Sequence, residues 1–474
     1  MSTSTAPQPP ADPRPLTHSA STDVPARQLG GRFALLPALA GREFLPIGLF
    51  ARLPLAMLTL GTLTLATSVT GSYAVGGATA GAVGIGSAVG APIFGWLADR
   101  IGQRPVLLVS AVLNVVAVLA VIATAYLIPG VHDVGTAWGV IATALAAGLS
   151  CPQVGPLARV RWMALTAESR HAGNSSELDV ALSYESTADE LTFVLGPALV
   201  GVLASLLAPW LPLALAAALT LTLVPAFAVH RTHAAVPRRA AGTRVDCANS
   251  GTPNTGTPST EKASTAKVST GSGRARTRAR SRIAGLAAVA LPVLAMVCMG
   301  TFFGSTQAAL SAFAAGFATS EAAGLLYAVM GISSAAAAIS VAYWPAGFPV
   351  AARWVTGAAA MAGLSVLLFL PTDGWGMVLV LLALGLPVGP VMVTVFAIGG
   401  LVAPAGRLAT VMTALASGIV AGTALGSSIG GQLAQEGGHQ AAFLVTAAAA
   451  AALFALGAVA AAVVRSRKRT AQAS

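Results

Sequence analysis

Long apolar runs alternate with short polar turns between residues 47 and 464 of the chain. Each run has about 18 to 25 residues, which an α-helix rising about 1.5 Å per residue needs to cross a hydrocarbon core of about 30 Å. The pattern predicts twelve transmembrane helices, at residues 47–72, 74–97, 106–127, 136–157, 184–208, a sixth ending at 230, then 283–313, 322–344, 354–370, 376–402, 408–433 and 441–464.

Polar segments divide these helices into two groups of six. Residues 1–45 are rich in Pro, Ser, Thr and Ala without apolar periodicity, which predicts a disordered N-terminal tail that lacks the features of a secretory signal peptide. Residues 231–282 are rich in Ser, Thr, Gly, Pro, Lys and Arg, so we expect a disordered basic linker. Residues 465–474 form a basic tail. The predicted halves, residues 46–230 and 283–464, suggest a two-fold repeated architecture.

Composition supports a membrane protein. Of 474 residues, 55% are hydrophobic and only 9% are charged, whereas about a quarter of the residues in soluble domains are charged. The fold class predicted is therefore an all-α membrane protein embedded in a lipid bilayer.

The basic residues lie on one side of the predicted topology. With the N-terminus in the cytoplasm, the 27 Lys and Arg residues fall in predicted cytoplasmic segments, with Arg52 and Arg353 as the exceptions. This is the expected cytoplasmic retention of positive charge, so both termini are predicted to be cytoplasmic. The linker has no interleaved aromatic residues for base stacking, and the net charge of +11 therefore does not indicate a nucleic-acid partner.

Chemical motifs of other protein classes are missing from the sequence. Cys151, Cys247 and Cys298 have unrelated spacings, which supports neither a disulfide framework nor a zinc site. The sequence has no nucleotide-binding motif and no His, Cys or acid cluster at metal-ligand spacing. We expect no cofactor, no bound metal and no enzymatic activity, and an ion gradient rather than ATP as the energy source.

A charged turn separates the second and third predicted helices. It carries defined residues at Gly95, Leu97, Ala98, Asp99, Arg100, Gly102 and Arg104. Glycine permits close helix approach and tight turns, an aspartate suits a helix N-terminus or an arginine, and the arginines seek acids or carbonyls. A generic cytoplasmic turn would explain the arginines but neither Asp99 nor the glycines.

This turn resembles the signature of the major facilitator superfamily in its residues, its position and the number of helices around it. The resemblance implies the twelve-helix fold of that family and a turn that latches the two halves together on the cytoplasmic side in the outward-facing state. It also places the chain in a bacterial inner membrane. The corresponding turn at residues 343–349 lacks the signature, and Arg353 is the only charge near it. We therefore expect ionic contacts at only one of the two symmetric latch positions.

Four ionisable residues are predicted near membrane depth, where charge is costly and usually functional. Arg52 lies early in helix 1, and Glu185, Asp189 and Glu190 open helix 5. Glu185 and Asp189 share a helical face and Glu190 points away, so an ion pair between Arg52 and Asp189 is possible. One interpretation is a proton-coupling relay. The other is structural, with Arg52 reaching the interface and the acids in water if helix 5 begins at Leu191.

Two glycine patterns indicate close helix contacts. Gly196, Pro197 and Gly201 partly match the family's antiporter signature on helix 5, which implies a bend and an association with export, although simple helix packing is an alternative. On helix 11, a stripe of small residues predicts tight packing against a neighbour; it comprises Gly422, Gly426, Gly430 and Gly431.

Family geometry places helices 1, 4, 7 and 10 around a central cavity. Their polar candidates are uncharged: Thr59, Thr62, Ser150, Gln153, Ser305, Thr306, Gln307 and Thr394. A neutral cavity suits a drug-like or amphipathic substrate. We predict a monomeric secondary transporter that exports such compounds by proton antiport through alternating access. A proton-coupled importer of a small nutrient and a transport-dead membrane sensor or scaffold are the alternatives.

Overall fold

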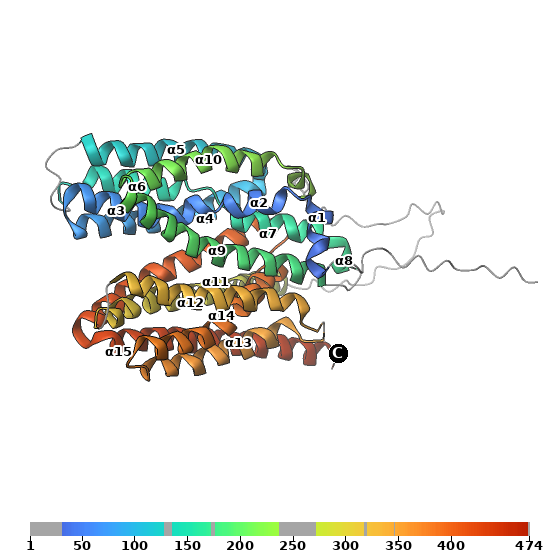
Figure 1. Cartoon of the computed structure of the whole chain (residues 1–474). Coiled ribbons are helices and arrows are strands. Elements are labelled where there is room, and N and C mark those ends of the chain that lie inside the picture. Colours follow the sequence, from blue (N-terminus) through green and yellow to red (C-terminus); the bar gives the residue numbers. More distant parts are fainter. Residues whose placement is uncertain are drawn as a thin grey trace, which may run out of the picture.

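The computed structural model is almost entirely helical and describes residues 31–127, 135–171, 176–236, 272–316, 320–345 and 347–472. Two helical bundles lie against each other, one coloured blue to green and the other yellow to red (Figure 1). Within these residues, eleven helices are long and apolar enough to cross a membrane. The last of them has a non-helical residue at Gly438 and forms two spans, so the fold has twelve. The prediction of an all-α membrane protein with two halves of six helices is confirmed.

The N-terminal half contains six spans, of which the first and the fourth are each built from two helices. Its helices are α1 (Leu35–Ala40), α2 (Phe44–Phe50), α3 (Leu53–Thr70), α4 (Tyr73–Ile101), α5 (Gln103–Leu127), α6 (Trp138–Leu149), α7 (Val154–Leu165), α8 (Ala167–His171), α9 (Ser176–Leu206) and α10 (Leu211–Val229).

The C-terminal half contains five helices that make six spans, because α15 holds the last two. They are α11 (Ser272–Ala314), α12 (Ser320–Ser340), α13 (Val350–Ser365), α14 (Gly374–Val402) and α15 (Leu408–Gln472). Short 3-10 turns flank the helices in both halves, including η2 (Arg32–Ala34), η3 (Arg231–Ala235), η4 (Val341–Tyr343) and η5 (Val366–Phe369).

The segments expected to be disordered are partly helical. Residues 32–44 form η2, α1 and the start of α2, and the side chains of Leu36, Ala40 and Phe44 are buried. In the predicted linker, η3 follows α10 and packs on α7, and α11 already begins at Ser272. The basic tail continues α15 as far as Gln472. These short segments gain order by packing on or extending the bundle, which composition does not reveal. Residues 1–30 and 237–271, including Cys247, lie outside the described residues.

Two predicted helix boundaries were wrong around the fourth and fifth spans. The fourth span continues through α7 to Leu165 rather than ending at residue 157, and the fifth begins at Ser176 rather than residue 184. The charged residues interrupt the apolar runs, so the hydropathy pattern predicts that these segments lie in water. Inside the bundle their charged side chains have partners elsewhere in the fold: Arg159 pairs with Asp189, Arg161 donates to Gln103, and Asp179 pairs with Arg353.

Glycines let α11 and the first part of α15 pack at backbone distance. A Cβ on Gly422 would lie 2.9 Å from the Thr301 backbone nitrogen, and a Cβ on Gly426 would lie 2.8 Å from Thr301 Cα. Gly300 and Gly304 on α11 make the reciprocal approach to α15. Gly422, Gly426 and Gly430 of the stripe therefore form a packing surface, as their spacing predicts, whereas Gly431 meets no neighbour.

The alanine variant Gly426→Ala should lower stability by about 1–3 kcal/mol, since its new methyl group has no space against the α11 backbone. Thermal unfolding of the detergent-solubilised protein measures the effect. Gly431→Ala is the matched control, because nothing lies within 4 Å of its Cβ position. Equal melting temperatures for the two variants would contradict this role of Gly426.

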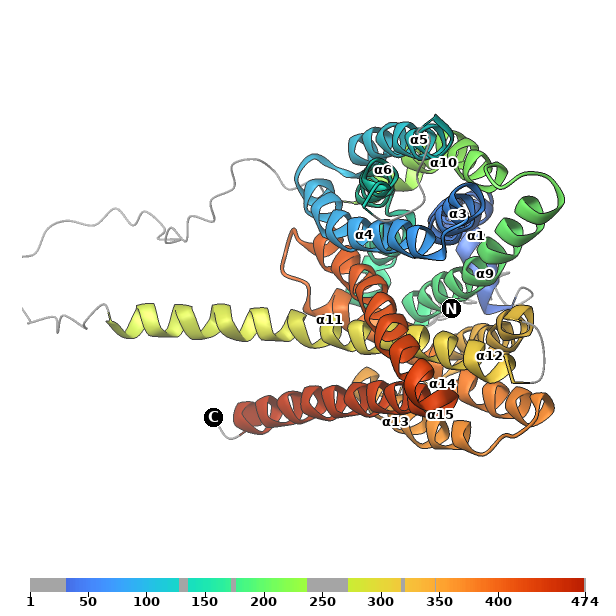
Figure 2. The same cartoon turned by 90° about the vertical axis from the view of Figure 1, so that its left-hand side faces the viewer.

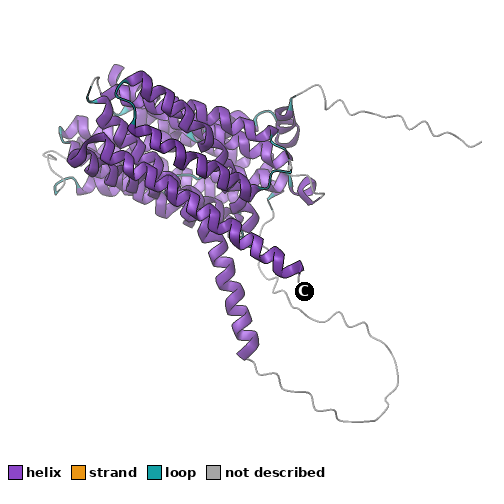
Figure 3. Cartoon of the chain, turned by 90° about the horizontal axis from the view of Figure 1, so that it is seen from below, coloured by secondary structure: helices purple, strands orange, loops and turns teal. Residues whose placement is uncertain are grey.

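The two halves meet along two pairs of helices. The first part of α15 crosses α4, and α12 packs against α9 (Figure 2). Figure 3 shows the same bundle from below, with the helices running roughly along one common direction. We call the end of the bundle that carries residues 95–105 the signature end.

Candidate functional site

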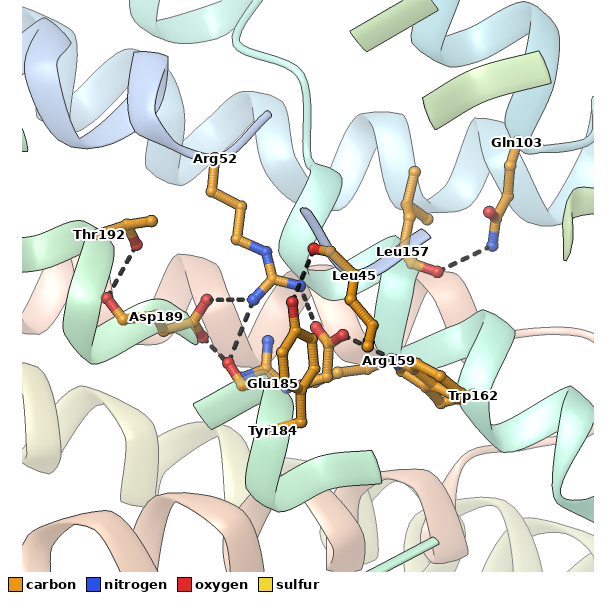
Figure 4. Close-up of polar contacts among 10 residues, drawn as sticks. All are labelled: Leu45, Arg52, Gln103, Leu157, Arg159, Trp162, Tyr184, Glu185, Asp189 and Thr192. Carbon is orange, nitrogen blue, oxygen red and sulfur yellow. Dashed lines mark hydrogen bonds and ion pairs between the residues drawn. The ribbon is translucent and has the colours of Figure 1, made fainter. Parts of the chain in front are cut away.

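Arg52 is buried at the break between α2 and α3. Its Nη1 lies 3.0 Å from Asp189 Oδ1 and donates to the Glu185 carbonyl oxygen at 3.1 Å, and its Nη2 pairs with Glu185 Oε2 (Figure 4). Arg52 is 5% exposed and Glu185 is 1% exposed. The structure thus joins the predicted residues of helix 1 and helix 5 in one buried ion-pair cluster.

Two residues of α7 complete this charge cluster. Arg159 Nη2 lies 2.6 Å from Asp189 Oδ2, and Trp162 Nε1 donates to Glu185 Oε1 at 2.7 Å. Arg159 also lies over the ring of Phe396 from α14, with 3.9 Å between Cζ and the ring centroid. We use "charge cluster" for Arg52, Arg159, Glu185 and Asp189. Two positive and two negative side chains neutralise one another, which offsets the cost of burying each charge.

The sequence interpretation missed Arg159 and Arg161, because it ended the fourth helix at residue 157 and counted both as cytoplasmic. Both lie within the α7 span and are at most 1% exposed. Arg161 donates to Gln103 Oε1 at 2.8 Å and to the Phe227 carbonyl at 2.7 Å. It therefore ties the signature turn to α7 and α10. One signal in the sequence could have indicated their role. Arg159 and Trp162 are three residues apart, so they share a helical face and can contact the same neighbouring helix.

Glu190 points away from the charge cluster toward the other half. Its Oε1 accepts a hydrogen bond from Ser334 Oγ of α12 at 2.8 Å, and the residue is 6% exposed. Within the described residues Glu190 makes no ion pair. The alternative in which helix 5 begins at Leu191 and leaves the acids in water does not fit, since α9 begins at Ser176 and encloses them.

A cavity of about 80 Å³ lies beside the charge cluster, between the two halves. Its wall includes charged side chains of the N-terminal half and aromatic rings from both halves, among them Arg52, Arg159, Asp189, Phe193 and Phe396. The prediction of an uncharged cavity was wrong. Arg52 comes from the first of the four expected helices, Asp189 comes from the fifth helix, and Arg159 comes from a part of the fourth span that was expected to be a cytoplasmic loop.

The polar cavity candidates have different surroundings. Gln153 lines the cavity. Thr59 is exposed on the helical face that also carries Arg52, seven residues earlier, and Gln307 is exposed on α11. Thr394 is buried and donates to the Pro390 carbonyl of its own helix at 2.7 Å. Helix carbonyls also accept from the remaining hydroxyls, those of Thr62, Ser150, Ser305 and Thr306.

Asp99 caps the N-terminus of α15 from the opposite half. Its Oδ1 accepts from the Ala409 backbone N–H at 2.9 Å, and its Oδ2 accepts from the Thr410 N–H at 2.8 Å and hydroxyl at 2.6 Å. An aspartate in this position satisfies orphan helix donors and the helix dipole. A Cβ on Gly95 would lie 2.7 Å from the Ala409 carbonyl oxygen, so only glycine allows this approach.

The other signature residues shape and flank this contact. Gly102 has a φ of 95°, a conformation that favours glycine. Arg100 lies over the ring of Trp96 at 4.7 Å, Leu97 packs on the core, and Arg104 is exposed.

An ion pair joins the halves at the symmetric position. Arg353 Nη1 of α13 lies 3.0 Å from Asp179 Oδ2 in the first turn of α9, and Arg353 Nε donates to the Phe348 carbonyl at 2.9 Å. The expectation that the ionic contact lies at the signature turn alone was therefore wrong, because the ion pair lies at the other latch position. The partner acid, Asp179, lies on the other half, in a segment that the sequence pattern predicts to be a loop.

The N-terminal segment also bridges the halves. Arg32 Nη1 donates to the Ala342 carbonyl at 2.6 Å, and Phe33 lies against Tyr343 with 6.3 Å between ring centroids. We call the Asp99, Asp179–Arg353 and Arg32 contacts the inter-half contacts.

The partial antiporter signature lies in the middle of α9, which continues through Pro197. A Cβ on Gly196 would lie 2.6 Å from Ala56 Cβ of α3, whereas nothing lies within 4 Å of the Cβ position of Gly201. Gly196 therefore allows close helix packing, and Gly201 does not serve that purpose. For metals, the described residues contain no group of three or more His, Cys, Asp or Glu side chains suited to hold an ion.

Twelve membrane spans in two halves around a cavity define a polytopic membrane transport protein. The chain belongs to the Major Facilitator Superfamily, whose sequence profile matches residues 45–416. It is accordingly a membrane transporter and not an enzyme.

Solved structures show the same fold at low sequence identity. The human organic anion transporter MFSD10 (TETRAN) is 18% identical with a TM-score of 0.61, covering 88% of this chain and 98% of its own. The transporter FucP in its outward conformation is 15% identical with a TM-score of 0.59, covering 90% and 99%. A bacterial homologue of the iron transporter ferroportin in its outward-facing state is 14% identical with a TM-score of 0.60, covering 88% and 98%. A search of curated protein sequences finds no match.

Proposed function

We propose that the chain is a proton-coupled secondary transporter of small amphipathic molecules that works by alternating access. One observation carries the proposal: the charge cluster lies at the wall of the cavity between the halves, and Asp189 is shared there by Arg52 and Arg159. The chemistry of a carboxylate between two arginines is suited to exchanging a proton for an ion pair.

The inter-half contacts support a closed signature end. Each of them joins a group of one half to a group of the other, so the halves cannot separate there while the contacts persist. We assign this end to the cytoplasm and this conformation to the outward-facing side of the cycle. The similar structures of FucP and the ferroportin homologue are described as outward-facing. In this proposal, both termini are cytoplasmic, the membrane is a bacterial inner membrane, and one monomer suffices.

Proton binding at Asp189 would change the pairing in the charge cluster. Protonation removes one negative charge, so Arg52 and Arg159 lose a shared ionic partner. Glu185 keeps its bonds to Arg52 and Trp162. The released arginine donors are then available for a substrate or for a different arrangement of the helices. This is how the cluster would link protonation to transport.

Two candidate directions follow from different observations. Export is our first candidate, because Gly196 and Pro197 match part of the antiporter signature and Gly196 brings α9 against α3. Uptake with a proton is the second, because two arginines in the cavity wall favour a substrate that carries negative charge. Both directions use the same cavity and the same charge cluster.

Reconstituted vesicles test the proposal and separate the two directions. An amphipathic substrate should accumulate against its gradient in inside-acid vesicles if the protein is an antiporter, and in inside-alkaline vesicles if it is a symporter. A protonophore should abolish accumulation in either case. Accumulation that persists with the protonophore present would exclude proton coupling.

A further inference from the structure

Two side chains of the charge cluster carry buried donors without a protein acceptor. The Nε atoms of Arg52 and Arg159 have no hydrogen-bond partner in the described part of the chain. Both arginines line the cavity, and their side chains are 4% and 1% exposed. Since a buried donor without an acceptor is costly, these groups favour a ligand that accepts hydrogen bonds.

The start of α7 brings further donors to the same cavity. Pro152 precedes the helix and Pro156 lies in its first turn, and α7 begins at Val154. The Gln153 side chain donates to the Cys151 carbonyl at 2.9 Å and does not cap the helix. In the described residues, no group accepts from the backbone N–H of Val154 or of Gly155. The N-terminus of a 12-residue helix therefore presents free N–H groups and the positive end of its dipole.

These donors converge near Gly155, which lines the cavity. A Cβ on Gly155 would lie 3.5 Å from Arg52 Nε, 3.7 Å from Arg159 Nη1 and 3.4 Å from Asp189 Oδ1. The helix start and both guanidinium groups therefore lie within a few ångströms of one point. A helix N-terminus inside a membrane transporter, combined with arginines, is an arrangement suited to an anion.

We infer that this place binds the carboxylate of a small organic monoanion. The rest of the cavity wall is mainly apolar, including Leu55, Phe193, Phe396 and Ile419, and suits a hydrocarbon or aromatic body. The charge cluster is already neutral, so one further negative charge is balanced by protonation of Asp189, while a phosphate dianion would leave an excess. The inference rests on the proposed transport function, and because the anion and the proton bind together, it supports the second candidate direction, uptake with a proton.

Equilibrium binding to the purified full-length protein in lipid nanodiscs tests the inference without a proton gradient. The probes are benzoate, the neutral benzamide and the cationic benzylammonium, measured by isothermal titration calorimetry. Benzoate should bind saturably and at least about tenfold more tightly than either other compound, since it has two acceptor oxygens and a negative charge, whereas benzamide has one acceptor oxygen and no charge and benzylammonium has no acceptor.

The variant Gly155→Ala should weaken benzoate binding by at least about tenfold. Its methyl group would occupy the point where the donors meet, at ordinary contact distances and without any change of charge. Gly363→Ala on α13 is the matched control, because nothing lies within 4 Å of its Cβ position. Unchanged thermal unfolding of Gly155→Ala would show that the loss is local.

Besides the absence of benzoate binding, three results would overturn the inference. They are equal or tighter binding of benzamide or benzylammonium, benzoate binding that Gly155→Ala leaves unchanged, and displacement of benzoate by chloride at equal concentration. Failure of the transport function gives a different pattern, namely selective benzoate binding without any pH-driven accumulation. Conversely, pH-driven transport of another compound with no benzoate binding would retain the proposed function and reject the carboxylate site.

Discussion

Asp189→Asn should abolish the ability of a pH gradient to drive transport. If one proton moves with each substrate, a gradient of one pH unit supports an accumulation ratio of about ten, and the variant should reduce this ratio to about one. Asparagine keeps the shape and one acceptor oxygen toward Arg52 and Arg159 but cannot exchange a proton. The ratio is measured in reconstituted vesicles with an imposed pH gradient.

The control for this prediction is Glu177→Gln on the same helix. Glu177 lies in the first turn of α9 and accepts a hydrogen bond from Ser169 within its own half, away from the charge cluster. This variant should accumulate substrate like the parent protein. Asp189→Asn should still let substrate equilibrate down its own concentration gradient, and this activity would show that the variant folds. Normal accumulation by Asp189→Asn would reduce Asp189 to a structural residue.

Breaking the Asp179–Arg353 pair should shift the conformational equilibrium away from the state closed at the signature end. The pair is mostly buried, with side chains 15% and 5% exposed, so either Asp179→Asn or Arg353→Met leaves a charge without its partner. Removing one partner of a buried pair costs about 3–5 kcal/mol at most. We expect the ratio of closed to open populations to fall at least about tenfold in each single variant. In the double variant, the two effects should be non-additive by at least about 1 kcal/mol.

Distances between spin labels measure this equilibrium. Exposed positions Glu168 and Ala405 lie on different halves, so cysteines introduced there report opening of the signature end once the three native cysteines are replaced. Glu177→Gln is again the control, because its hydrogen bond to Ser169 does not cross between halves. Additive effects in the double variant would mean that the two residues do not act as a latch.

Much of the charge cluster could be predicted from local spacing along the chain. Arg52 and Asp189 were placed at similar depth by counting residues, and Glu190 was predicted to face away from Glu185 because of the helical period. Arg159 was missed because a hydropathy count ends a helix where charges appear. Once paired with Asp189, such charges can remain inside the bundle.

The contact between Arg353 and Asp179 could not be predicted from the sequence either. The turn at residues 343–349 has no signature, and nothing in the local sequence indicates that Arg353 pairs with an acid of the other half. Asp179 is 174 positions away along the chain. Only the packing of α12 and η4 against α9 brings the two together.

The sequence by itself determined the membrane class, the twelve spans, their division into halves and the signature turn, because run length, charge asymmetry and motif spacing are local properties. The tertiary structure alone decided that the cavity is charged, that the fourth span breaks before α7, and that both latch positions are polar contacts. These features depend on pairs such as Arg52 and Glu185, which are 133 positions apart. A buried charge is tolerated only where the fold supplies its partner, and that partner is not visible in the local sequence.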